Sequence, residues 1–335
     1  MNATCSPAMA AADYAGRNVL VTGASGFIGG SIVRHLLGKG CRIRRHARRP
    51  LTPLDCWALG DSSGDPMAQA TWDEALDGID VVFHCAAQTS VYQAATDPVG
   101  DLDANVAVTL RLLEAARRQS RPPTVIMAST ATVFGLPKTL PVRHGDRPAP
   151  VTAYDTGKLA AEGYLALYAR LGHVAGGALR LANVFGPGPS SSTADRGILN
   201  KVVQKALAGG PVTLFGDGHW VRDYIFIDDV VAAFLLAGSH GEALAGDAFL
   251  VCSGTGTTVA DAFRLAAAVA AERTGIAVAV DSVASPDGLS AIEFRDFVGT
   301  WDALGAAAGW RPVTSLRAGI EKTAESFLAA ASGRV

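Results

Sequence analysis

Short apolar runs alternate with longer amphipathic segments through the first half of the chain. Apolar runs that are rich in β-branched residues and end in glycine or polar residues predict buried parallel strands. Such strands are expected at residues 18–22, 41–46, 80–85, 124–128 and 178–181. Between the strands, apolar residues recur at helical spacing, which predicts helices at 27–37, 105–118 and 152–171. This alternation favours right-handed crossovers and a doubly wound parallel sheet.

The pattern becomes less regular after residue 181. Helices are expected at 197–208, 259–273 and 316–331, and a strand at 224–227. We therefore expect an α/β protein with a Rossmann-like domain and a smaller C-terminal α/β domain that binds substrate. The first domain would comprise residues 16–180 and about 224–252, and the second about 181–223 and 253–331. Residues 1–15 are expected to form a loose N-terminal tail.

The composition is that of a globular protein. The chain has 335 residues, of which 49% are hydrophobic and 18% charged, and this is enough to bury a sizeable core. A net charge of −2 gives no general attraction to nucleic acid or to an anionic membrane surface. The longest apolar run, residues 230–237, is too short to cross a bilayer. We expect no nucleic-acid and no membrane partner.

The five cysteines are widely spaced and contain no CxxC pair. This spacing is typical of buried thiols in a reducing compartment, and it predicts neither a disulfide framework nor a metal site. The opening residues MNATCSPAMAAADYAG lack the basic and apolar regions of a signal peptide. A cytoplasmic location is therefore expected.

A glycine-rich turn follows the first expected strand and reads Gly23-Ala24-Ser25-Gly26-Phe27-Ile28-Gly29. Glycines let a backbone turn tightly and approach a pyrophosphate, while the N-terminus of the following helix faces the phosphate charge. The spacing is GxxGxxG rather than GxGxxG, and a plain structural turn is the alternative. Its position between a strand and a helix favours dinucleotide binding. The expected cofactor contacts are Gly23, Ser25, Gly26, Phe27, Ile28 and Gly29.

The second expected strand ends in basic rather than acidic residues. A carboxylate at this point binds the adenosine ribose of NAD, but no Asp or Glu occurs between Asp13 and Asp55. The segment instead contains Arg48 and Arg49, and a guanidinium can pair with a 2′-phosphate. The cofactor is therefore NAD or NADP, with NADP favoured and Arg48 preferred over Arg49. The alternative is a solvated basic strand end.

Two further segments are candidates for cofactor binding. Asp61 and Ser62 would meet the adenine at the end of a third strand. Ala86 and Ala87 follow the strand at 80–85, where small residues allow a dinucleotide to lie close to the backbone. His84 precedes them and is interpreted as a packed core histidine.

Tyr154 and Lys158 lie four residues apart, so they share one face of a helix. An ammonium beside a phenol favours the phenolate, which can act as a general acid or base on a carbon-bound hydroxyl. Thr130 directly follows the apolar run at 124–128 and would lie near this pair. With the glycine turn, these residues predict a nicotinamide-dependent enzyme that acts on a hydroxyl or a ketone.

The ordered motifs resemble those of the extended short-chain dehydrogenase/reductase family, in its nucleotide-sugar epimerase/dehydratase group. The resemblance covers nearly the whole chain. It rests on VTGASGFIGG, HCAAQ, NVAVTLRLLEAA, ASTATVFG, YDTGKLAAE, ALRLANVFGPG, LFGDGHWVRDYIFIDDVVAAFLLA, AFLVCSGTGTTV, FRDFVG and AAGWRPVTSLRAGI.

The resemblance implies roles for residues on both sides of the site. Tyr154 would transfer the proton, and Lys158 would also hold the nicotinamide ribose. Thr130 would hydrogen-bond the reacting sugar oxygen, and Ser129 would lie near the nicotinamide. The positions that would bind the nucleotide diphosphate of a sugar substrate are Asn183, Arg222 and Arg295. Arginine suits this task because its fork can donate two parallel hydrogen bonds.

The resemblance also excludes two reactions of the group. The 4,6-dehydratases carry an acid pair directly after the threonine, and the decarboxylases carry a glutamate there. This chain has Ala131 and Thr132 at those positions. Dehydration and decarboxylation are therefore not expected.

Two chemistries fit the remaining residues. A nucleotide-diphosphate-sugar 4-epimerase would pass through a transient 4-keto intermediate, whereas an NADPH-dependent 4-keto-sugar reductase would use its cofactor once per turnover. We expect the epimerase. A non-enzymatic NADP sensor is a third reading, against which the presence of Thr130, Tyr154 and Lys158 argues. The resemblance further implies a homodimer formed through residues 104–118 and 153–171, and the loop at 186–196 is expected to help set the sugar specificity.

Overall fold

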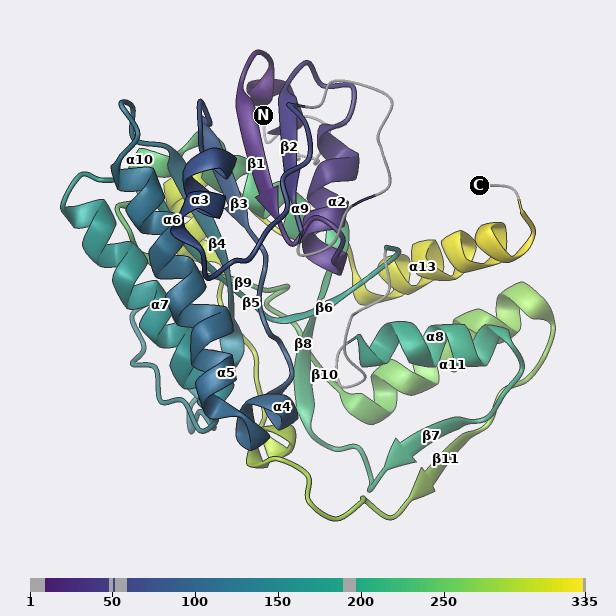
Figure 1. The fold of residues 1–335 in the computed structure, drawn as a ribbon. Helices are drawn as coiled ribbons and strands as arrows, with labels where there is room; N and C mark the ends of the chain where they lie inside the picture. The colour runs from purple at the N-terminus through teal and green to yellow at the C-terminus, as the bar shows by residue number, and fades with distance from the viewer. Residues whose placement is uncertain (1–9, 48–50, 52–58, 189–196, 334–335) are drawn as a thin grey trace.

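The centre of the molecule is a parallel β-sheet. The computed structural model describes residues 10–47, 51, 59–188 and 197–333 (Figure 1). Six strands lie in the order β2-β1-β3-β4-β5-β9, and every adjacent pair is parallel. The strands are β1 (Asn18–Thr22), β2 (Arg42–His46), β3 (Val81–His84), β4 (Thr124–Thr130), β5 (Ala175–Leu181) and β9 (Ala248–Val251). The predicted doubly wound α/β fold is confirmed.

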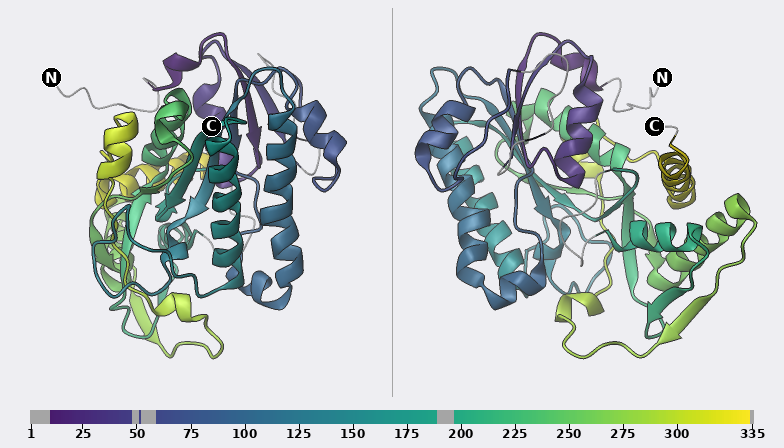
Figure 2. Two further views of the ribbon diagram at one scale, coloured as in Figure 1. Left: turned by 90° about the vertical axis from the view of Figure 1, so that its left-hand side faces the viewer. Right: turned by 45° about the vertical axis from the view of Figure 1, so that its right-hand side comes forward.

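Helices cover both faces of this sheet (Figures 1 and 2). One face packs against α3 (Gln69–Ala75), α6 (Val108–Arg117) and α7 (Ala153–Arg170), and the other against α2 (Phe27–Leu36) and α9 (Ile227–Ser239). Successive side chains of a strand point to opposite faces. Leu20 therefore lies in the core beneath α3, α6 and α7, whereas Val19 and Val21 lie in the core beneath α2 and α9.

The later part of the chain adds two small sheets and three helices. One sheet has the order β10-β8-β6 and the other pairs β11 with β7. The strands are β6 (Asn183–Phe185), β7 (Val212–Phe215), β8 (Val221–Phe226), β10 (Gly256–Thr258) and β11 (Val280–Val283). The helices are α8 (Ile198–Leu207), α11 (Val259–Thr274) and α13 (Leu316–Ala331), which lie on the side of the molecule away from α6 and α7 (Figure 2). Their buried residues belong to the same core as the sheet face under α2 and α9.

Shorter elements connect these parts. They are η1 (Ala11–Tyr14), α4 (Val91–Thr96), α5 (Pro98–Leu102), η2 (Asp103–Ala107), η3 (Ala131–Phe134), α10 (Gly241–Leu244), η4 (Ala291–Phe294) and α12 (Asp302–Ala308). The helix predicted at 105–118 begins as a π-helical turn, η2, and continues as α6.

The apolar run at 230–237 forms the middle of α9. All its residues are buried, because the helix packs against the sheet, α2 and α12 (Asp302–Ala308). A helix that is apolar on all sides is typical of such a position. Within the described residues, no helix combines the length and the apolar character that crossing a bilayer requires.

The basic residues of strand β2 have structural partners. Arg44 Nη1 donates to the carbonyl oxygens of Glu74, Ala75 and Asp77, at 3.0, 2.9 and 3.1 Å. These carbonyls lie at the C-terminal end of α3, where backbone acceptors have no partner within the helix. Arg44 therefore fastens α3 to the edge of the sheet, which explains an arginine inside a strand.

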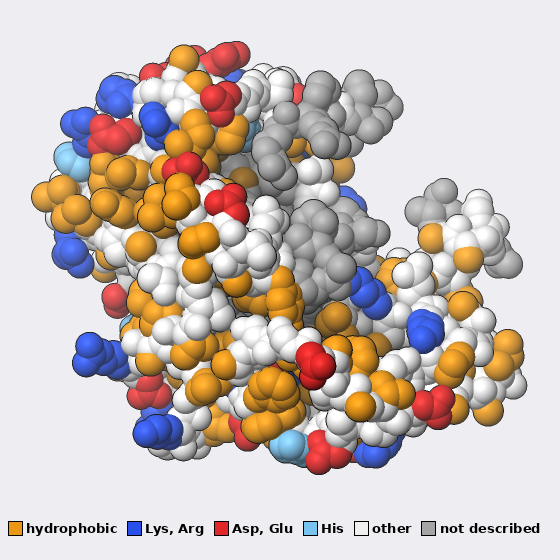
Figure 3. Space-filling model, turned by 60° about the horizontal axis from the view of Figure 1, so that its bottom comes forward, with side chains coloured by type: hydrophobic (Ala, Val, Ile, Leu, Met, Phe, Trp, Pro, Cys, Tyr) orange, Lys and Arg blue, Asp and Glu red, His pale blue; other side chains and the backbone are white. Residues whose placement is uncertain are grey.

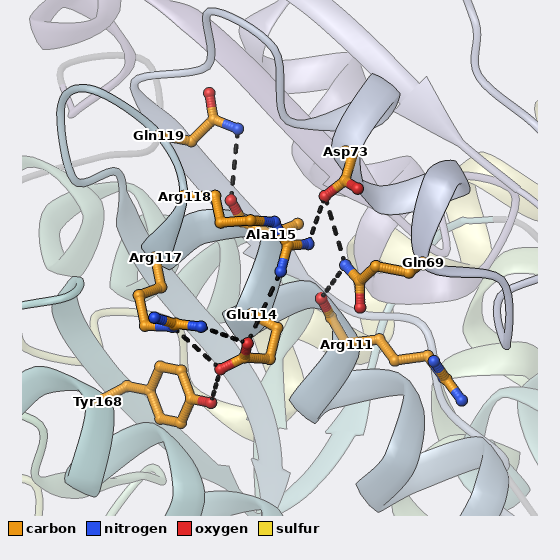
Figure 4. A network of polar contacts seen from close by, with 9 residues as sticks. All are labelled: Gln69, Asp73, Arg111, Glu114, Ala115, Arg117, Arg118, Gln119 and Tyr168. Carbon is orange, nitrogen blue, oxygen red and sulfur yellow. Dashed lines mark hydrogen bonds and ion pairs between the residues drawn. The ribbon is translucent and has the colours of Figure 1, made fainter.

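A polar network fastens α3, α6 and α7 on the outer surface (Figure 4). Glu114 of α6 accepts hydrogen bonds from the Tyr168 hydroxyl and from Arg117 Nη2, the latter at 2.8 Å. Arg118 Nη2 lies 2.5 Å from Asp73 Oδ1 of α3.

On the face drawn in Figure 3, acidic and basic side chains are interspersed among apolar ones.

Candidate active site

The glycine turn lies where the strand order reverses. The chain passes from β1 outward to β2 and then returns to β3 on the other side of β1. Ligands of open α/β sheets bind beyond the carboxyl ends of the strands at such a switch point. Here Gly23 has a φ of +64°, and a Cβ on it would lie 2.8 Å from the backbone nitrogen of Ala86. The turn after β1 and the loop after β3 therefore approach each other closely only because residue 23 is glycine.

The first turn of α2 is suited to an anionic group. A Cβ on Gly29 would lie 2.4 Å from the carbonyl oxygen of Gly23, so glycine lets the helix pack directly on the turn. Gly26 is the N-cap residue, and the first turn contains no acidic side chain. Ser25 is exposed, and Phe27 and Ile28 begin the helix half-buried. The free backbone N–H groups of a helix N-terminus attract a phosphate, so these residues fit the predicted dinucleotide.

A buried histidine holds the loop after β3. The backbone N–H of Ala86 donates to Thr22 Oγ1 at 3.1 Å, and Thr22 Oγ1 lies 2.9 Å from Nδ1 of His84. Nε2 of His84 lies 3.1 Å from Thr109 Oγ1, which donates to the carbonyl of Asn105. Burial lowers the pKa of the His84 imidazole to about 3, so the ring is neutral. His84 thus fixes Ala86, as expected of a core histidine rather than a catalyst.

Tyr154 and Lys158 lie one turn apart near the start of α7, and both are buried. The helix begins at Thr152, whose hydroxyl accepts the backbone N–H of Asp155 at 3.1 Å. The ring of Tyr154 packs against Val91 of α4 and Ile292 of η4. The phenol therefore lies where the sheet and a late segment of the chain meet.

Lys158 carries its charge in a buried environment. Burial lowers the pKa of its ammonium to about 8, while the carboxylates of Glu162 and Asp101 act in the opposite direction. Within the part of the chain that the structure describes, the ammonium makes no hydrogen bond to a side chain or carbonyl, so its donors can serve a ligand. Tyr154 and Lys158 thus lie one turn apart and buried on one helix, and their roles in proton transfer stay a prediction.

Two buried carboxylates near Lys158 were not predicted. Asp101 accepts hydrogen bonds from Gln88 Nε2 at 2.7 Å and from Asn105 Nδ2 at 2.9 Å, and burial raises its pKa. Glu162 lies 2.7 Å from Arg180 Nη2. Glu162 is four residues after Lys158, so helical spacing from Tyr154 and Lys158 contained the signal that would have found it.

Ser129 and Thr130 form the end of strand β4. The hydroxyl of Ser129 donates to Glu162 Oε1 at 2.5 Å. Oγ1 of Thr130 lies 2.7 Å from Oγ1 of Thr132, and Thr132 donates in turn to Asp155. Thr132 and Asp155 are further polar residues of the site that were not predicted. Both residues predicted at the end of this strand thus lie beside α7, where Tyr154 and Lys158 lie.

The two predicted diphosphate arginines lie together beside η4. Arg222 of β8 donates to the carbonyl of Arg295 and, at 2.6 Å, to that of Glu293. Arg295 Nη1 donates to the carbonyl of Ile292 at 2.7 Å. Burial lowers the pKa of Arg222. In this state both guanidinium groups therefore hold the backbone around η4, whose Ile292 contacts Tyr154.

Asn183 starts β6 and pairs with Tyr224 of β8, two residues after Arg222 in that strand. Asp223 of the same strand is fully buried. It accepts the backbone N–H groups of Ser253 and Gly254 at 2.7 and 3.0 Å, and that of Gly299 at 3.3 Å. This carboxylate joins three segments behind the arginines.

The structure describes only some of the residues predicted to bind the adenosine end of the cofactor. Arg48 and Arg49 lie outside the described residues. Asp61 pairs with Arg45 of β2, whose Nε lies 2.7 Å from Oδ1, and Ser62 Oγ lies 2.8 Å from Nδ1 of His46. Both residues therefore lie at the carboxyl end of β2, with side-chain partners that the sequence did not predict.

The loop predicted to influence specificity is described only at its start. Arg34 Nη2 of α2 donates to the carbonyl of Pro187 at 3.4 Å, and a Cβ on Gly188 would lie 2.8 Å from the ring of Phe27. Ala87 follows Ala86 and is half-buried.

Among the described residues, no three His, Cys, Asp or Glu side chains are grouped so that they could hold a metal ion.

Comparison with known proteins identifies relatives over most of the chain. The family model described as "NAD dependent epimerase/dehydratase family" matches residues 19–252. The UDP-glucose 4-epimerase of Mycolicibacterium smegmatis is 32% identical over 330 residues, which cover 92% of this chain and 97% of that protein. The GDP-6-deoxy-D-mannose reductase of Pseudomonas aeruginosa is 29% identical and covers 90% of this chain and 94% of its own length.

A solved structure agrees with the fold. The UDP-glucose 4-epimerase of Thermotoga maritima, determined with UDP-glucose, superposes with a TM-score of 0.81 at 29% identity. The match covers 94% of this chain and 99% of that chain.

Proposed function

Because the chain belongs to the NAD-dependent epimerase/dehydratase family, we propose that it is a nucleotide-diphosphate-sugar 4-epimerase. The observation that carries this proposal is the placement of Tyr154 and Lys158 on one buried face of α7, beside the end of β4 where Thr130 lies. Both a UDP-glucose 4-epimerase and a reductase of a nucleotide sugar are similar to it over nine tenths of its length.

The proton chemistry follows from the placement of Tyr154. Its phenolate accepts the proton of the sugar C4 hydroxyl while hydride leaves C4, and the same phenol returns the proton after the ketone has turned over. When bound, the nicotinamide supplies the acceptor and then the donor of that hydride. Lys158 stabilises the phenolate by its charge and holds the ribose hydroxyls with its free donors.

The residues after Thr130 support an epimerase over a dehydratase. Elimination of water needs an acid near the leaving hydroxyl, but Ala131 carries no ionisable group and Thr132 donates its hydroxyl to Asp155. Proton exchange with C4 is thus carried by Tyr154 alone among the residues that we assign to catalysis.

We infer that the dinucleotide binds over the glycine turn, with its pyrophosphate at the start of α2. Gly23 and Gly29 support this placement, because the absence of a Cβ lets the turn pack closely on the loop after β3 and on the start of α2, whose backbone N–H groups suit a pyrophosphate. No acid ends strand β2, which favours NADP and assigns Arg48, and secondarily Arg49, to a 2′-phosphate. Asp61 and Ser62 would border the adenine.

We propose that Arg222, Arg295 and Asn183 bind the diphosphate of the substrate. To do so the two arginines exchange the carbonyls of residues 292–295 for phosphate oxygens, which are stronger acceptors. Residues 181–223 and 253–331, which include Arg222 and η4, belong in this proposal to the smaller substrate domain. We also propose a cytoplasmic homodimer formed through α6 and α7, where Tyr164, Leu167 and Leu171 are exposed.

A reductase of 4-keto sugar nucleotides is the second candidate. It is favoured by the basic end of β2, since NADPH is the cellular reductant, and by the similarity to a GDP-6-deoxy-D-mannose reductase. It differs from the epimerase in consuming one reduced cofactor per turnover.

One experiment separates the two. The purified protein is denatured and any released dinucleotide is identified, and fresh protein is then incubated with UDP-, GDP- and dTDP-hexoses. Formation of the 4-epimer without added cofactor supports the epimerase. Consumption of added NADPH with 4-keto substrates alone would show that the reductase is correct.

A further inference from the structure

The carboxylate of Asp101 in α5 lies against the start of α7, and the residue is only 2% exposed. Its Oδ1 accepts hydrogen bonds from Gln88 Nε2 at 2.7 Å and from Asn105 Nδ2 at 2.9 Å. The described residues make no hydrogen bond to Oδ2, and a Cβ on Gly157 would lie 3.0 Å from that oxygen. Gly157 directly precedes Lys158, so the unbonded oxygen faces the helix that carries the ammonium.

The ammonium of Lys158 is buried without a bonded partner. The residue is 3% exposed, and it makes no hydrogen bond or ion pair with the described part of the chain. Removing an unpaired ammonium from water is unfavourable, and burial lowers its pKa to about 8. The charges that surround Lys158 therefore decide whether it stays protonated in the site.

Several titratable groups face Lys158 and supply little net charge. Glu162, one turn along α7, favours the ammonium, but it lies 2.7 Å from Arg180 Nη2 of β5, so a cation offsets its charge. Burial raises the pKa of the Cys85 thiol to about 12 and lowers that of His84 to about 3, so both groups at the end of β3 are neutral.

Two further carboxylates remain, those of Asp155 and Asp101. The hydroxyls of Thr132 and Thr152 donate to the two oxygens of Asp155, so both are occupied. Asp101 is bonded only through Oδ1, and only to neutral side-chain amides. Burial raises the pKa of Asp101, whereas the amide donors and the charge of Lys158 favour its ionised form. Asp101 is thus a carboxylate without a bonded cation and with one oxygen unbonded by the described residues.

We propose that Asp101 is a positioning residue whose negative charge keeps the buried Lys158 ammonium in place as a cation. The use made of that cation rests on the proposed function, in which it stabilises the Tyr154 phenolate. The two groups form no direct ion pair here, so the attraction acts across the buried space between them, where little water screens it. Without this carboxylate the pKa of the ammonium should fall, and the cation should be lost at a lower pH.

Isosteric substitution separates the charge of Asp101 from its structural role. Asp101→Asn keeps a carbonyl oxygen that can accept both amide donors, and it removes the charge. Asp101→Ser is a second neutral variant, with a smaller side chain and an oxygen that also accepts. Asp103→Asn is the matched control, because it makes the same change of charge two residues further on, at a half-buried position. Thermal melting of each variant checks that it folds.

The direct test is a titration of Lys158 by nuclear magnetic resonance. The protein is labelled with lysine carrying ¹³C at Cε, and the Lys158 signal is identified by its absence in Lys158→Arg. We expect a midpoint near pH 8 in the unchanged protein. Asp101→Asn and Asp101→Ser should lower the midpoint by about one pH unit, and Asp103→Asn by less than about 0.3 units.

Two outcomes of this titration would overturn the inference. A midpoint that stays in place in a folded Asp101 variant would show that the carboxylate has only a structural role. An equal shift in Asp103→Asn would show a general effect of net charge rather than one of Asp101.

A pH profile of 4-epimer formation separates this inference from the proposed function. In an active protein, the alkaline decline of kcat should move with the Lys158 midpoint, by about one pH unit in Asp101→Asn. If the midpoint moves but no sugar nucleotide is epimerised at any pH, the inference about Asp101 stands and the proposed function fails. If epimerisation occurs and neither the midpoint nor the decline moves, the function stands and the inference is wrong.

Discussion

The two sides of the candidate site are built with different kinds of hydrogen bond. On the side of β4 and α7, polar side chains bond to one another, as in the pairs Thr132–Asp155 and Ser129–Glu162. On the side of β8 and η4, polar side chains bond to backbone. Arg222 donates to carbonyls near residue 293, and Asp223 accepts backbone N–H groups from three loop positions.

Because of this difference, substitutions on the two sides should have different effects. A substitution on the first side alters which groups donate and accept while the strand and helix stay in place. A substitution on the second side releases segments of backbone, so it changes the position of whole loops. We therefore expect activity to fall without loss of stability on the first side, and both to fall together on the second.

The largest expected effect is on the first side. Tyr154→Phe removes the group that transfers the proton, and we expect kcat for the proposed epimerisation to fall by roughly 100- to 10,000-fold. The melting temperature should change little, because the ring still packs against Val91 and Ile292. Steady-state rates and thermal melting of the same preparation provide the measurement. Unchanged turnover would contradict the catalytic assignment.

The second prediction concerns the other side. Asp223→Ala would leave the N–H groups of Ser253 and Gly254 without their acceptor in a fully buried position. We expect the free energy of unfolding, measured with urea, to fall by about 2–4 kcal/mol. Asp217→Ala is the control, since that side chain is largely exposed and should cost little. An unchanged free energy of unfolding in Asp223→Ala would contradict the expectation that this side of the site stabilises the fold.

A third prediction uses the charge of Lys158. Since burial lowers its pKa to about 8, the ammonium is present below that pH and is lost as the pH rises through it. Activity that needs the ammonium should therefore decline above about pH 8, approaching tenfold per pH unit. Glu162→Gln removes a carboxylate that favours the ammonium, so the decline should begin at a lower pH. A decline that moved to higher pH in this variant would contradict the assignment.

The smallest effect is expected away from both sides. Arg118→Ala interrupts the surface network of α3, α6 and α7 shown in Figure 4, where Arg118 and Asp73 are both more than one-third exposed. Exposed ion pairs of this kind contribute about 0–1 kcal/mol. Urea unfolding should detect at most that loss, and the proposed activity should be unchanged. A loss as large as that of Asp223→Ala would show that the outer network is as important as the buried one.

The strands of the sheet could be predicted from sequence because buried parallel strands are short apolar runs, such as Asn18–Thr22 and Thr124–Thr130. The glycine turn and the Tyr154–Lys158 pair were local signals as well. The small sheet of β7 and β11 was not predicted, because β7 alternates between buried and exposed positions over only four residues and β11 is mostly exposed.

The partners of the site were harder to predict for a different reason. Asp101 reaches Gln88, and Thr132 reaches Asp155, through contacts between residues 13 and 23 positions apart in the chain. Nothing in the local pattern of residues indicates such pairs, because they depend on how helices settle on the sheet. The hydrogen bond from Thr132 to Asp155 was also not predicted, because the sequence indicated only that residue 132 is not an acid.

The core that lies beneath α2 and α9 has a consequence for synthesis on the ribosome. Five strands and the helices α3, α6 and α7 have been made once residue 181 has been translated, so one face of the sheet can close early. On the other face only α2 is available by then. Val21, Phe83 and Leu179 await α9, and the same core extends to Ala324 near the end of the chain. A nascent chain therefore presents one finished and one open face, and the open face is where a chaperone would bind until translation ends.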